Sequence, residues 1–417
     1  MKPWFGGMII GVVVTLVVTF VVGWIGGGVD ELEAGKLVIL SGRDDSAGDQ
    51  RQALIDAWNA THPQQQARIE ELPPQADAAH SEMVARAQSG DHDVDIYNLD
   101  VTWTAEFADE GYIQPLDAAE LDTTGFLPNT LETCRYEREL YALPFNTDAG
   151  LLYYRDDLVS PFSTWPSIRA EFEKAFAPRQ DPALLAGYTG QLGNYEGLTV
   201  NALEAMQAAA GGSVVRDNEV VVDLAVMNDG LDRLRPTSGD PQFILPESLE
   251  YDETASTEAF GDRKVLFMRN WPVAYRQLSP AIDGDTPDQQ LDFRVVPLPG
   301  PSVLGGQNLA IAENSDEPQA AQALIEFLTD ARSQQLLFER GGFAATREIV
   351  YRDAAVIERY PYSGVLLEAV QHARPRPVIP CYAQFTEFFH DTVHTSLRNR
   401  APLPGDFVSH LDDVMNC

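Results

Sequence analysis

Basic residues and cysteines are scarce in this chain of 417 residues. Lysine and arginine total 29 against 63 aspartates and glutamates, which gives a formal net charge of −34 at pH 7. So acidic a surface repels nucleic acid and anionic lipid headgroups, which excludes nucleic acid as a partner. The charge also argues against an anionic small ligand, unless a local basic pocket overrides the field. The chain has no long block of like charge, low-complexity segment or internal repeat, which excludes a disordered acidic tail and a solenoid.

The three cysteines, Cys134, Cys381 and Cys417, allow one disulfide and leave one thiol. None is spaced like a zinc-ligand pair, so we predict no metal site. The sequence predicts helices over 383–398 and 406–415, and antiparallel packing of two such helices would bring Cys417 back towards Cys381. A bridge between these two suits an oxidising compartment. The connectivity stays open at this point, as does the alternative of three free buried thiols.

The signatures of common enzymes are also missing. We find no Gly-x-Ser-x-Gly elbow, no His-Glu-x-x-His and no glycine-rich phosphate loop, so we predict that the protein is not an enzyme and binds no cofactor. A carboxylate pair such as Asp44 with Asp100 could serve a glycosidase, but such pairs arise by chance in so acidic a chain. Incubation with a labelled disaccharide would separate the two classes, because a binding protein returns its ligand unchanged.

The N-terminus carries a long apolar segment. No charged residue occurs from Pro3 to Val29, and Met8 to Ile25 is rich in Val, Ile, Leu and Phe. A run of this length can span a bilayer as a helix. One lysine precedes it and acidic residues follow it, which indicates a cytoplasmic N-terminus and an exported body. The cleavage site at Trp24-Ile25-Gly26-Gly27 is poor, and no cysteine follows for lipidation. We therefore predict an uncleaved membrane anchor with a short linker over 1–35.

About 380 residues follow, more than one hydrophobic core usually contains, so two lobes are expected. Strands over 37–40, 68–72 and 94–99 alternate with helices, and this βαβαβ order predicts a mostly parallel sheet with right-handed crossovers. A strand over 140–145 then ends in a turn at Asn146-Thr147-Asp148. The extended segment over 150–154 after it is predicted to cross between the lobes.

Two further strands precede aromatic or glycine-rich segments. Lys264 to Met268 is a short apolar run that places Trp271 near its carboxyl end, where open α/β sheets bind ligands. Asn308 to Ala312 is a second buried strand, entered through a Pro/Gly loop. An amphipathic helix follows, and Gly341-Gly342 end the next helix because left-handed backbone conformations cost glycine little.

This ordered set of motifs resembles the family 1 extracellular solute-binding proteins of ABC sugar importers, among them maltose- and trehalose-binding proteins. The resemblance covers Lys36 to Asn416 in the order and spacing of its segments. The motifs that carry it are Leu143-Pro144-Phe145, Leu151-Leu152-Tyr153-Tyr154, Thr164-Trp165-Pro166, Asn270-Trp271-Pro272 and Gly341-Gly342-Phe343. Many Gram-positive members are lipid-tethered, and this chain departs from that pattern.

The resemblance implies an α/β fold of the periplasmic-binding-protein type, in which two lobes, each a mostly parallel sheet flanked by helices, are joined by hinge crossovers. We place lobe one at 36–147 plus 306–355, and lobe two at 148–305 plus 356–417. It also implies an extracytoplasmic, monomeric protein that captures a neutral saccharide, a disaccharide such as trehalose or maltose, and delivers it to an ABC permease. The alternatives are a carbohydrate-acting enzyme, and a sensor or scaffold that uses the same fold. Two permease genes beside this one would indicate transport.

A sugar site needs planar polar groups for the hydroxyls and an aromatic face for the C–H surface. The predicted ligand-binding residues are Asp44, Asp100, Asn146, Asp148, Glu253, Trp271, Gly341, Gly342 and Arg376. Asp44, Asp100 and Glu253 are predicted because the resemblance implies that family members use carboxylates at these positions to bind hydroxyls. Arg376 is predicted because trehalose-binding relatives carry a comparable Arg-Pro run.

Each of these residues also has a simpler interpretation. Aspartates at strand ends cap helices, Asn146 and Asp148 suit an ordinary turn, and glycines end helices without any ligand. Glu253 would be a solvated charge in a first helical turn, and Trp271 would belong to the core.

The adjacent tyrosines Tyr153 and Tyr154 raise a different possibility, because iron-binding extracellular proteins use paired tyrosines as phenolate ligands. Here the pair follows Leu151-Leu152 in an apolar strand, where one of two alternating side chains faces the core. No companion set of histidine and carboxylate lies near it in the sequence. We therefore predict core packing for this pair.

Overall fold

A computed structural model of the chain describes residues 32–44, 46, 48–216, 218–279 and 291–417. The predicted anchor over Met8 to Ile25 lies outside the described residues. Among those that are described, every helix is too short or too polar to cross a bilayer.

The first sheet is built mainly from the N-terminal part of the chain. Its order is β2-β1-β3-β14-β6. Its strands are β1 (Gly35–Ser41), β2 (Gln65–Glu71), β3 (Ile96–Asp100), β6 (Ala142–Ala149) and β14 (Leu304–Ile311). The helices that belong with it are α2 (Gln50–Thr61), α3 (Ala76–Gln88), α4 (Thr104–Asp109), α5 (Pro128–Glu132), α11 (Pro318–Thr329) and α12 (Ala331–Leu336). Apolar side chains from the strands and from α2 and α11 form one continuous core, as their periodicity predicts.

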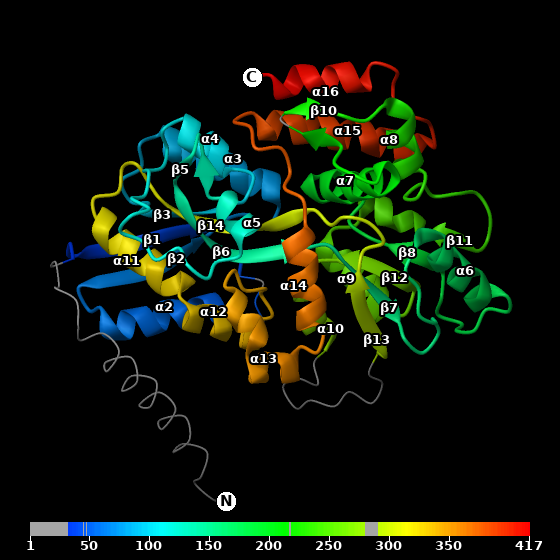
Figure 1. Ribbon diagram of the computed structural model, residues 1–417, viewed down its shortest axis with the longest axis horizontal. Helices are drawn as coiled ribbons and strands as arrows, with labels where there is room; N and C mark the ends of the chain where they lie inside the picture. The colour runs from blue at the N-terminus through cyan, green and yellow to red at the C-terminus, as the bar shows by residue number, and fades with distance from the viewer. Residues whose placement is uncertain (1–31, 45, 47, 217, 280–290) are drawn as a thin grey trace, which may run out of the picture.

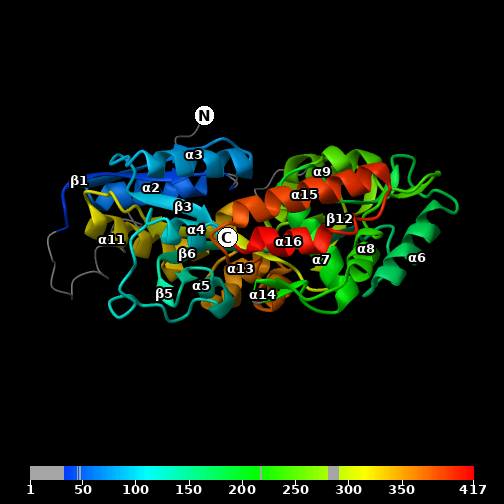
Figure 2. The same ribbon diagram turned by 90° about the horizontal axis from the view of Figure 1, so that it is seen from above.

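The second sheet has the order β11-β8-β12-β7-β13. Its strands are β7 (Leu151–Arg155), β8 (Ala186–Thr189), β11 (Gln242–Ile244), β12 (Val265–Asn270) and β13 (Phe293–Pro297). Its helices are α6 (Trp165–Phe176), α7 (Glu196–Ala210), α8 (Leu224–Leu231), α9 (Glu253–Gly261), α10 (Val273–Leu278), α15 (Tyr382–Asn399) and α16 (Phe407–Met415). Figures 1 and 2 show the two sheets side by side, with α15 and α16 packed together over the second lobe.

The remaining elements are short. They are the hairpins β4 (Arg135–Tyr136) with β5 (Glu139–Leu140) and β9 (Val215–Arg216) with β10 (Glu219–Val220), and the helices η1 (Pro246–Glu250), η3 (Leu337–Gly341), η4 (Glu348–Arg352), α13 (Ala354–Arg359) and α14 (Ser363–His372). The last four lie between the lobes at the junction (Figure 1), where Phe338, Tyr360 and Tyr362 join strands of lobe two in one core. The two-lobed α/β fold is as predicted, whereas the boundaries assigned to the lobes stay a prediction.

Each sheet contains antiparallel strand pairings besides the expected parallel ones. β1 pairs in parallel with β2 and β3, and β8 pairs in parallel with β11 and β12, but the other pairings are antiparallel. The reason is that β6 continues directly into β7, and β13 into β14, without a crossover helix that could return the chain in the same direction.

The predicted turn at Asn146-Thr147-Asp148 is wrong. These residues belong to β6, because β14 pairs with them through Gln307, Gly306 and Gly305. Gly306 has a φ of 122°, a conformation that favours glycine, and a Cβ atom there would lie 2.3 Å from the carbonyl oxygen of Asn146. The glycine pair thus allows β14 to approach closely and keeps β6 extended.

The cysteine pairing is confirmed. A disulfide joins Cys381, just before α15, to Cys417, just after α16, with 6.0 Å between the Cα atoms. Cys134 is a free, buried thiol. The predicted C-terminal helices agree with α15 and α16 to within one residue at each end.

Candidate ligand-binding site

Three backbone segments cross between the lobes and are hydrogen-bonded to one another. The Arg374 amide donates to Ser302 O over 2.8 Å, and the Leu304 amide donates to Arg374 O over 2.8 Å. The Ser302 hydroxyl donates to the carbonyl oxygen of Gly150 over 2.6 Å. The segments at Gly150, Ser302–Leu304 and Arg374 therefore form one narrow strip between the lobes.

A buried ion pair supports this strip from lobe two. Arg269, in β12, donates to both carboxylate oxygens of Glu204, in α7, over 2.8 Å each, and also to Gln191 Oε1 over 3.0 Å. Glu204 in turn accepts from the Val303 amide over 3.1 Å. A Cβ atom at Gly150 would lie 2.2 Å from Glu204 Oε1 and 2.8 Å from Arg269 Nη2, so a larger residue at this crossing would displace the ion pair. Neither Arg269 nor Glu204 is among the site residues predicted from the sequence.

Trp271 follows β12 directly, as predicted, and is partly exposed. The Arg269 guanidinium covers one face of its ring, with 3.8 Å between Cζ and the ring centroid. Its indole N–H donates to Glu253 over 3.3 Å, and Glu253 also accepts from the Tyr195 hydroxyl over 2.7 Å. Burial raises the pKa of the Glu253 carboxyl. Trp271 and Glu253 are thus brought together and held in a fixed orientation.

Arg376 connects the two lobes. Its Nη1 donates to Glu196, in the first turn of α7, over 2.6 Å, and its Nη2 donates to Asp100, at the end of β3, over 2.9 Å. The residue is 5% exposed. Glu196 also accepts from the hydroxyls of Tyr382 and Thr386. A ligand that used Arg376 would therefore share it with two carboxylates, so its predicted role in ligand contact stays a prediction.

Asp100 has a local role as well. Its Oδ1 accepts from the backbone amide and the hydroxyl of Thr102 over 3.0 and 2.8 Å. Such a turn starts the path into α4, although Trp103 rather than Asp100 occupies the cap position. The carboxylate is partly exposed and thus remains accessible beside its protein partners.

Asp148 lies near the end of β6, just before the crossing and next to Trp271. A Cβ atom placed on Gly305 would lie 3.2 Å from both Asp148 Cβ and Trp271 Cη2, so the two side chains flank the same point. Asn146 Nδ2 makes a long contact of 3.4 Å with Asp148 Oδ2. Burial, and then the nearby charge of Asp100, raise the pKa of Asp148 to about 7.

The carboxylate of Asp44 is directed at its own loop and helix. It accepts from the Ser46 amide over 3.0 Å and from the Arg51 amide over 3.1 Å, which satisfies donors at the start of α2. Because Asp100 is held by Arg376 and Asp44 by α2, the geometry gives no support to this pair as glycosidase carboxylates. A ligand-binding role of Asp44 stays a prediction.

Gly341 and Gly342 lie at the end of η3 and cap this helix. Gly342 has a φ of 84°, and its amide donates to Phe338 O over 3.0 Å. This amide is therefore committed to the helix end. A Cβ atom on Gly342 would lie 2.7 Å from Arg276 Cβ in α10, and one on Gly341 would lie 3.0 Å from Ser46 Cβ. The pair thus permits close packing, and ligand contact by Gly341 and Gly342 stays a prediction.

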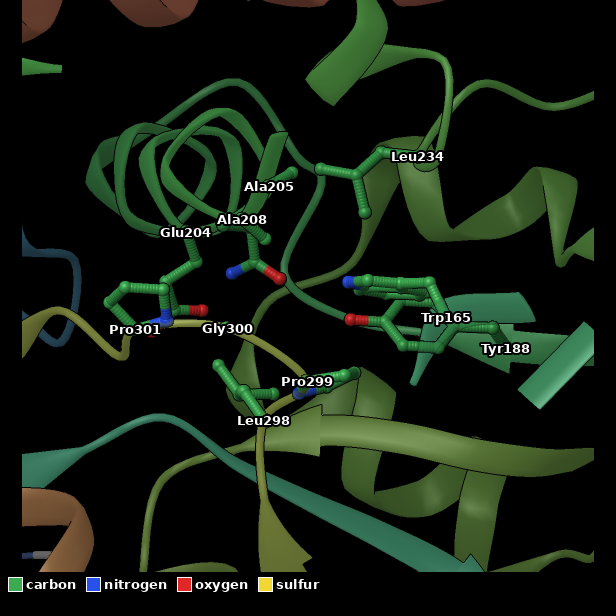
Figure 3. A pocket seen from close by; sticks show the side chains of 11 residues that line it. Trp165, Tyr188, Glu204, Ala205, Ala208, Leu234, Leu298, Pro299, Gly300 and Pro301 are labelled. Carbon is green, nitrogen blue, oxygen red and sulfur yellow. The ribbon is translucent and has the colours of Figure 1, made fainter. Parts of the chain in front are cut away.

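Two hollows outside the strip do not suit a saccharide. A cavity of about 10 Å³ lies between α7 and the segment Leu298–Pro301, and Trp165, Tyr188 and Glu204 are among the residues that line it (Figure 3). It is far smaller than ligand pockets of roughly 300–1,000 Å³. A surface groove of about 380 Å³ lies between the end of α15 and Pro402–Pro404, and the described residues that line it include no aromatic ring.

The predicted core packing of the tyrosine pair is confirmed. Tyr153 and Tyr154 are 0% and 6% exposed, and they pack into the cores of lobe two. Among the described residues, no group of three or more His, Cys, Asp or Glu side chains could hold a metal ion. The geometry therefore gives no support to iron binding at this pair.

Comparison with known proteins agrees with this architecture. The model of the family described as "Bacterial extracellular solute-binding protein" matches residues 53–361. The chain belongs to this family. The resemblance drawn from the sequence motifs is thereby confirmed, and the family is defined by solute binding outside the cytoplasm.

Individual relatives span nearly the whole of this solute-binding protein. A Deinococcus radiodurans protein described as a "Probable ABC transporter-binding protein" is 27% identical over 397 residues, which are 90% of this chain and 92% of that protein. Maltose-bound MalE3 of T. maritima is 26% identical with a TM-score of 0.79, over 91% of this chain and 98% of that one. A Thermotoga lettingae solute-binding protein bound with α-D-tagatose, 21% identical over 92% of this chain and all (100%) of that one, has a TM-score of 0.78 and shows the fold alone.

Proposed function

We propose that this solute-binding protein is the substrate-binding component of an ABC importer, and that it captures a neutral saccharide between its lobes. The observation that carries the proposal is the partly exposed ring of Trp271, held at the end of β12 by Arg269 and Glu253. Asp148 beside the ring supplies a polar group for hydroxyls. An aromatic face next to oriented polar groups is what a sugar requires, since its C–H surface is apolar and its rim is polar.

A disaccharide such as maltose or trehalose is the ligand we propose first, with an ABC permease as the protein partner and a monomer as the state in solution. The description of the Deinococcus relative as a probable ABC transporter-binding protein supports a role in transport. The maltose bound to T. maritima MalE3 supports a saccharide as the ligand. The three crossing segments support closure of the lobes by bending at the strip, which stabilises the closed state when both lobes contact the ligand.

A thermal-shift screen of residues 31–417 against mono- to tetrasaccharides tests this function. A true ligand is expected to raise the melting temperature in proportion to the logarithm of its concentration, because it binds only the folded state. Peptides, polyamines and ferric iron serve as the control set. The saccharide assignment fails if one of these shifts the melting temperature and no saccharide does.

We also propose that the body is held at the outer face of the membrane by an uncleaved N-terminal anchor. The support is the uncharged span from Pro3 to Val29 and the poor cleavage site within it. Mass spectrometry of protein extracted from membranes is expected to find peptides that precede Val29. A mature N-terminus between Gly26 and Lys36 would show cleavage instead.

A further inference from the structure

We propose that Asp148 binds the saccharide in its protonated form, as a hydrogen-bond donor, so that capture of the sugar requires a proton on this side chain and is favoured by acid. The inference rests on the proposed function, since it concerns how the same site holds a hydroxyl. The supporting geometry is that of the groups around Asp148, near the point where β6 leads into the crossing between the lobes.

The carboxyl group of Asp148 has few partners that would stabilise a negative charge. Within the described residues its hydrogen-bond donor is Asn146 Nδ2, at a long 3.4 Å, and no cationic side chain forms an ion pair with it. The nearby arginines are committed elsewhere: Arg269 to Glu204, and Arg51 through Nη2 to Gln307. Asp148 is only partly exposed, so a charged carboxylate in this position has lost part of its hydration without gaining an equivalent partner, which disfavours the charged form.

Asn146 provides an independent sign that a ligand atom belongs here. The residue is 3% exposed, and its Oδ1 has no donor among the described residues. A carbonyl oxygen of this kind requires a hydrogen-bond donor, whereas a protonated Asp148 requires an acceptor. One sugar hydroxyl satisfies both, because it accepts from the Asp148 carboxyl and donates to Asn146 Oδ1. A charged Asp148 would instead require a second donor from the ligand.

Charged and titratable groups face Asp148 from five elements. They are Asp100 in β3, Arg51 in α2, Arg269 in β12, Tyr153 in β7 and Tyr351 in η4. Burial and Asp100 raise the pKa of Asp148 to about 7, against the opposing charges of Arg269 and Arg51. The protonated form is therefore fully present below about pH 6 and is lost as the pH rises through 7.

The test is calorimetric titration with maltose, and in parallel with trehalose, from pH 5.5 to 8.5. Affinity is expected to fall about tenfold for each pH unit above 7, because only the protonated fraction binds. Titration at pH 8 in two buffers of different ionisation enthalpy is expected to show uptake of close to one proton per sugar bound. This second measurement uses the unmodified protein, so it does not depend on any variant being folded.

The matched variant is Asp148→Asn, which keeps a donor of the same shape but cannot titrate. It is expected to bind the sugar with one affinity from pH 5.5 to 8.5, whereas Asp100→Asn is expected to keep a pH dependence with its midpoint moved to lower pH, because the charge that helps to raise the pKa of Asp148 is removed. The inference is overturned if the affinity of the wild-type protein is independent of pH or rises with it. It is also overturned if the affinity of Asp148→Asn falls as the pH rises. Failure of both sugars at every pH would overturn the saccharide function together with this inference, whereas pH-independent binding overturns the inference alone.

Discussion

Replacing Glu204 with alanine is expected to lower the free energy of unfolding by about 3–5 kcal/mol. The cause is the guanidinium of Arg269, which is 1% exposed and would be left without its counter-charge. The substitution would also remove the acceptor of the Val303 amide, in one of the crossing segments. Denaturant unfolding followed by tryptophan fluorescence measures the loss as a shift of the midpoint.

Two variants control this experiment. Glu250 forms an ion pair with Arg398 in which both side chains are more than half exposed, so Glu250→Ala is expected to cost under about 1 kcal/mol. The double variant Glu204→Leu with Arg269→Met replaces the buried pair by apolar groups, and most of the lost stability should return. A Glu204→Ala variant as stable as Glu250→Ala would contradict the proposed role of the pair.

The same double variant separates stability from function. Arg269 is the side chain that covers one face of Trp271, so Arg269→Met removes the cation from the ring even where folding is restored. We therefore expect the double variant to be stable and still weakened in saccharide binding. The ion pair thus links the crossing strip to the aromatic ring, which the stability measurement alone would not reveal.

Much of the fold could be predicted from the sequence because strand and helix positions depend on local patterns. The apolar run before Asn270-Trp271-Pro272 predicts β12, and the patterns of the two C-terminal helices predict α15 and α16. Their antiparallel packing made the Cys381–Cys417 disulfide one of the possible pairings, and only the structure decides between them. The turn assigned to Asn146-Thr147-Asp148 failed because strand pairing across more than 150 residues overrode a local preference for turns.

The residues that hold the site together were harder to find. Glu204 and Arg269 are 65 positions apart, and only the tertiary structure brings them into contact. One signal was available: an arginine within an apolar strand, at Phe267-Met268-Arg269, requires a buried partner. Glu196 gave no comparable signal, because an acidic residue in the first turn of a helix is ordinary.

Replacing Trp271 with alanine is expected to weaken saccharide binding by about 2 kcal/mol, or roughly thirtyfold in dissociation constant. The variant removes the ring that would stack on the sugar, together with the hydrogen bond to Glu253. Because Trp271 is partly exposed, the cost in folding stability is expected to stay below the roughly 3–5 kcal/mol of a fully buried tryptophan. Calorimetric titration and denaturant unfolding of the same sample measure the two effects.

Trp58 is the matched control for this experiment. It is 2% exposed in the core of lobe one, and its indole N–H donates to Gln65 O over 2.7 Å. Trp58→Ala is therefore expected to lose the full stability of a buried ring and to keep its affinity for the sugar in the folded fraction. Trp271→Phe keeps an aromatic face without the donor to Glu253, so it should recover most of the binding. If Trp271→Ala instead behaves like Trp58→Ala, with a large loss of stability and intact affinity, then Trp271 belongs to the core and the sugar stacks elsewhere.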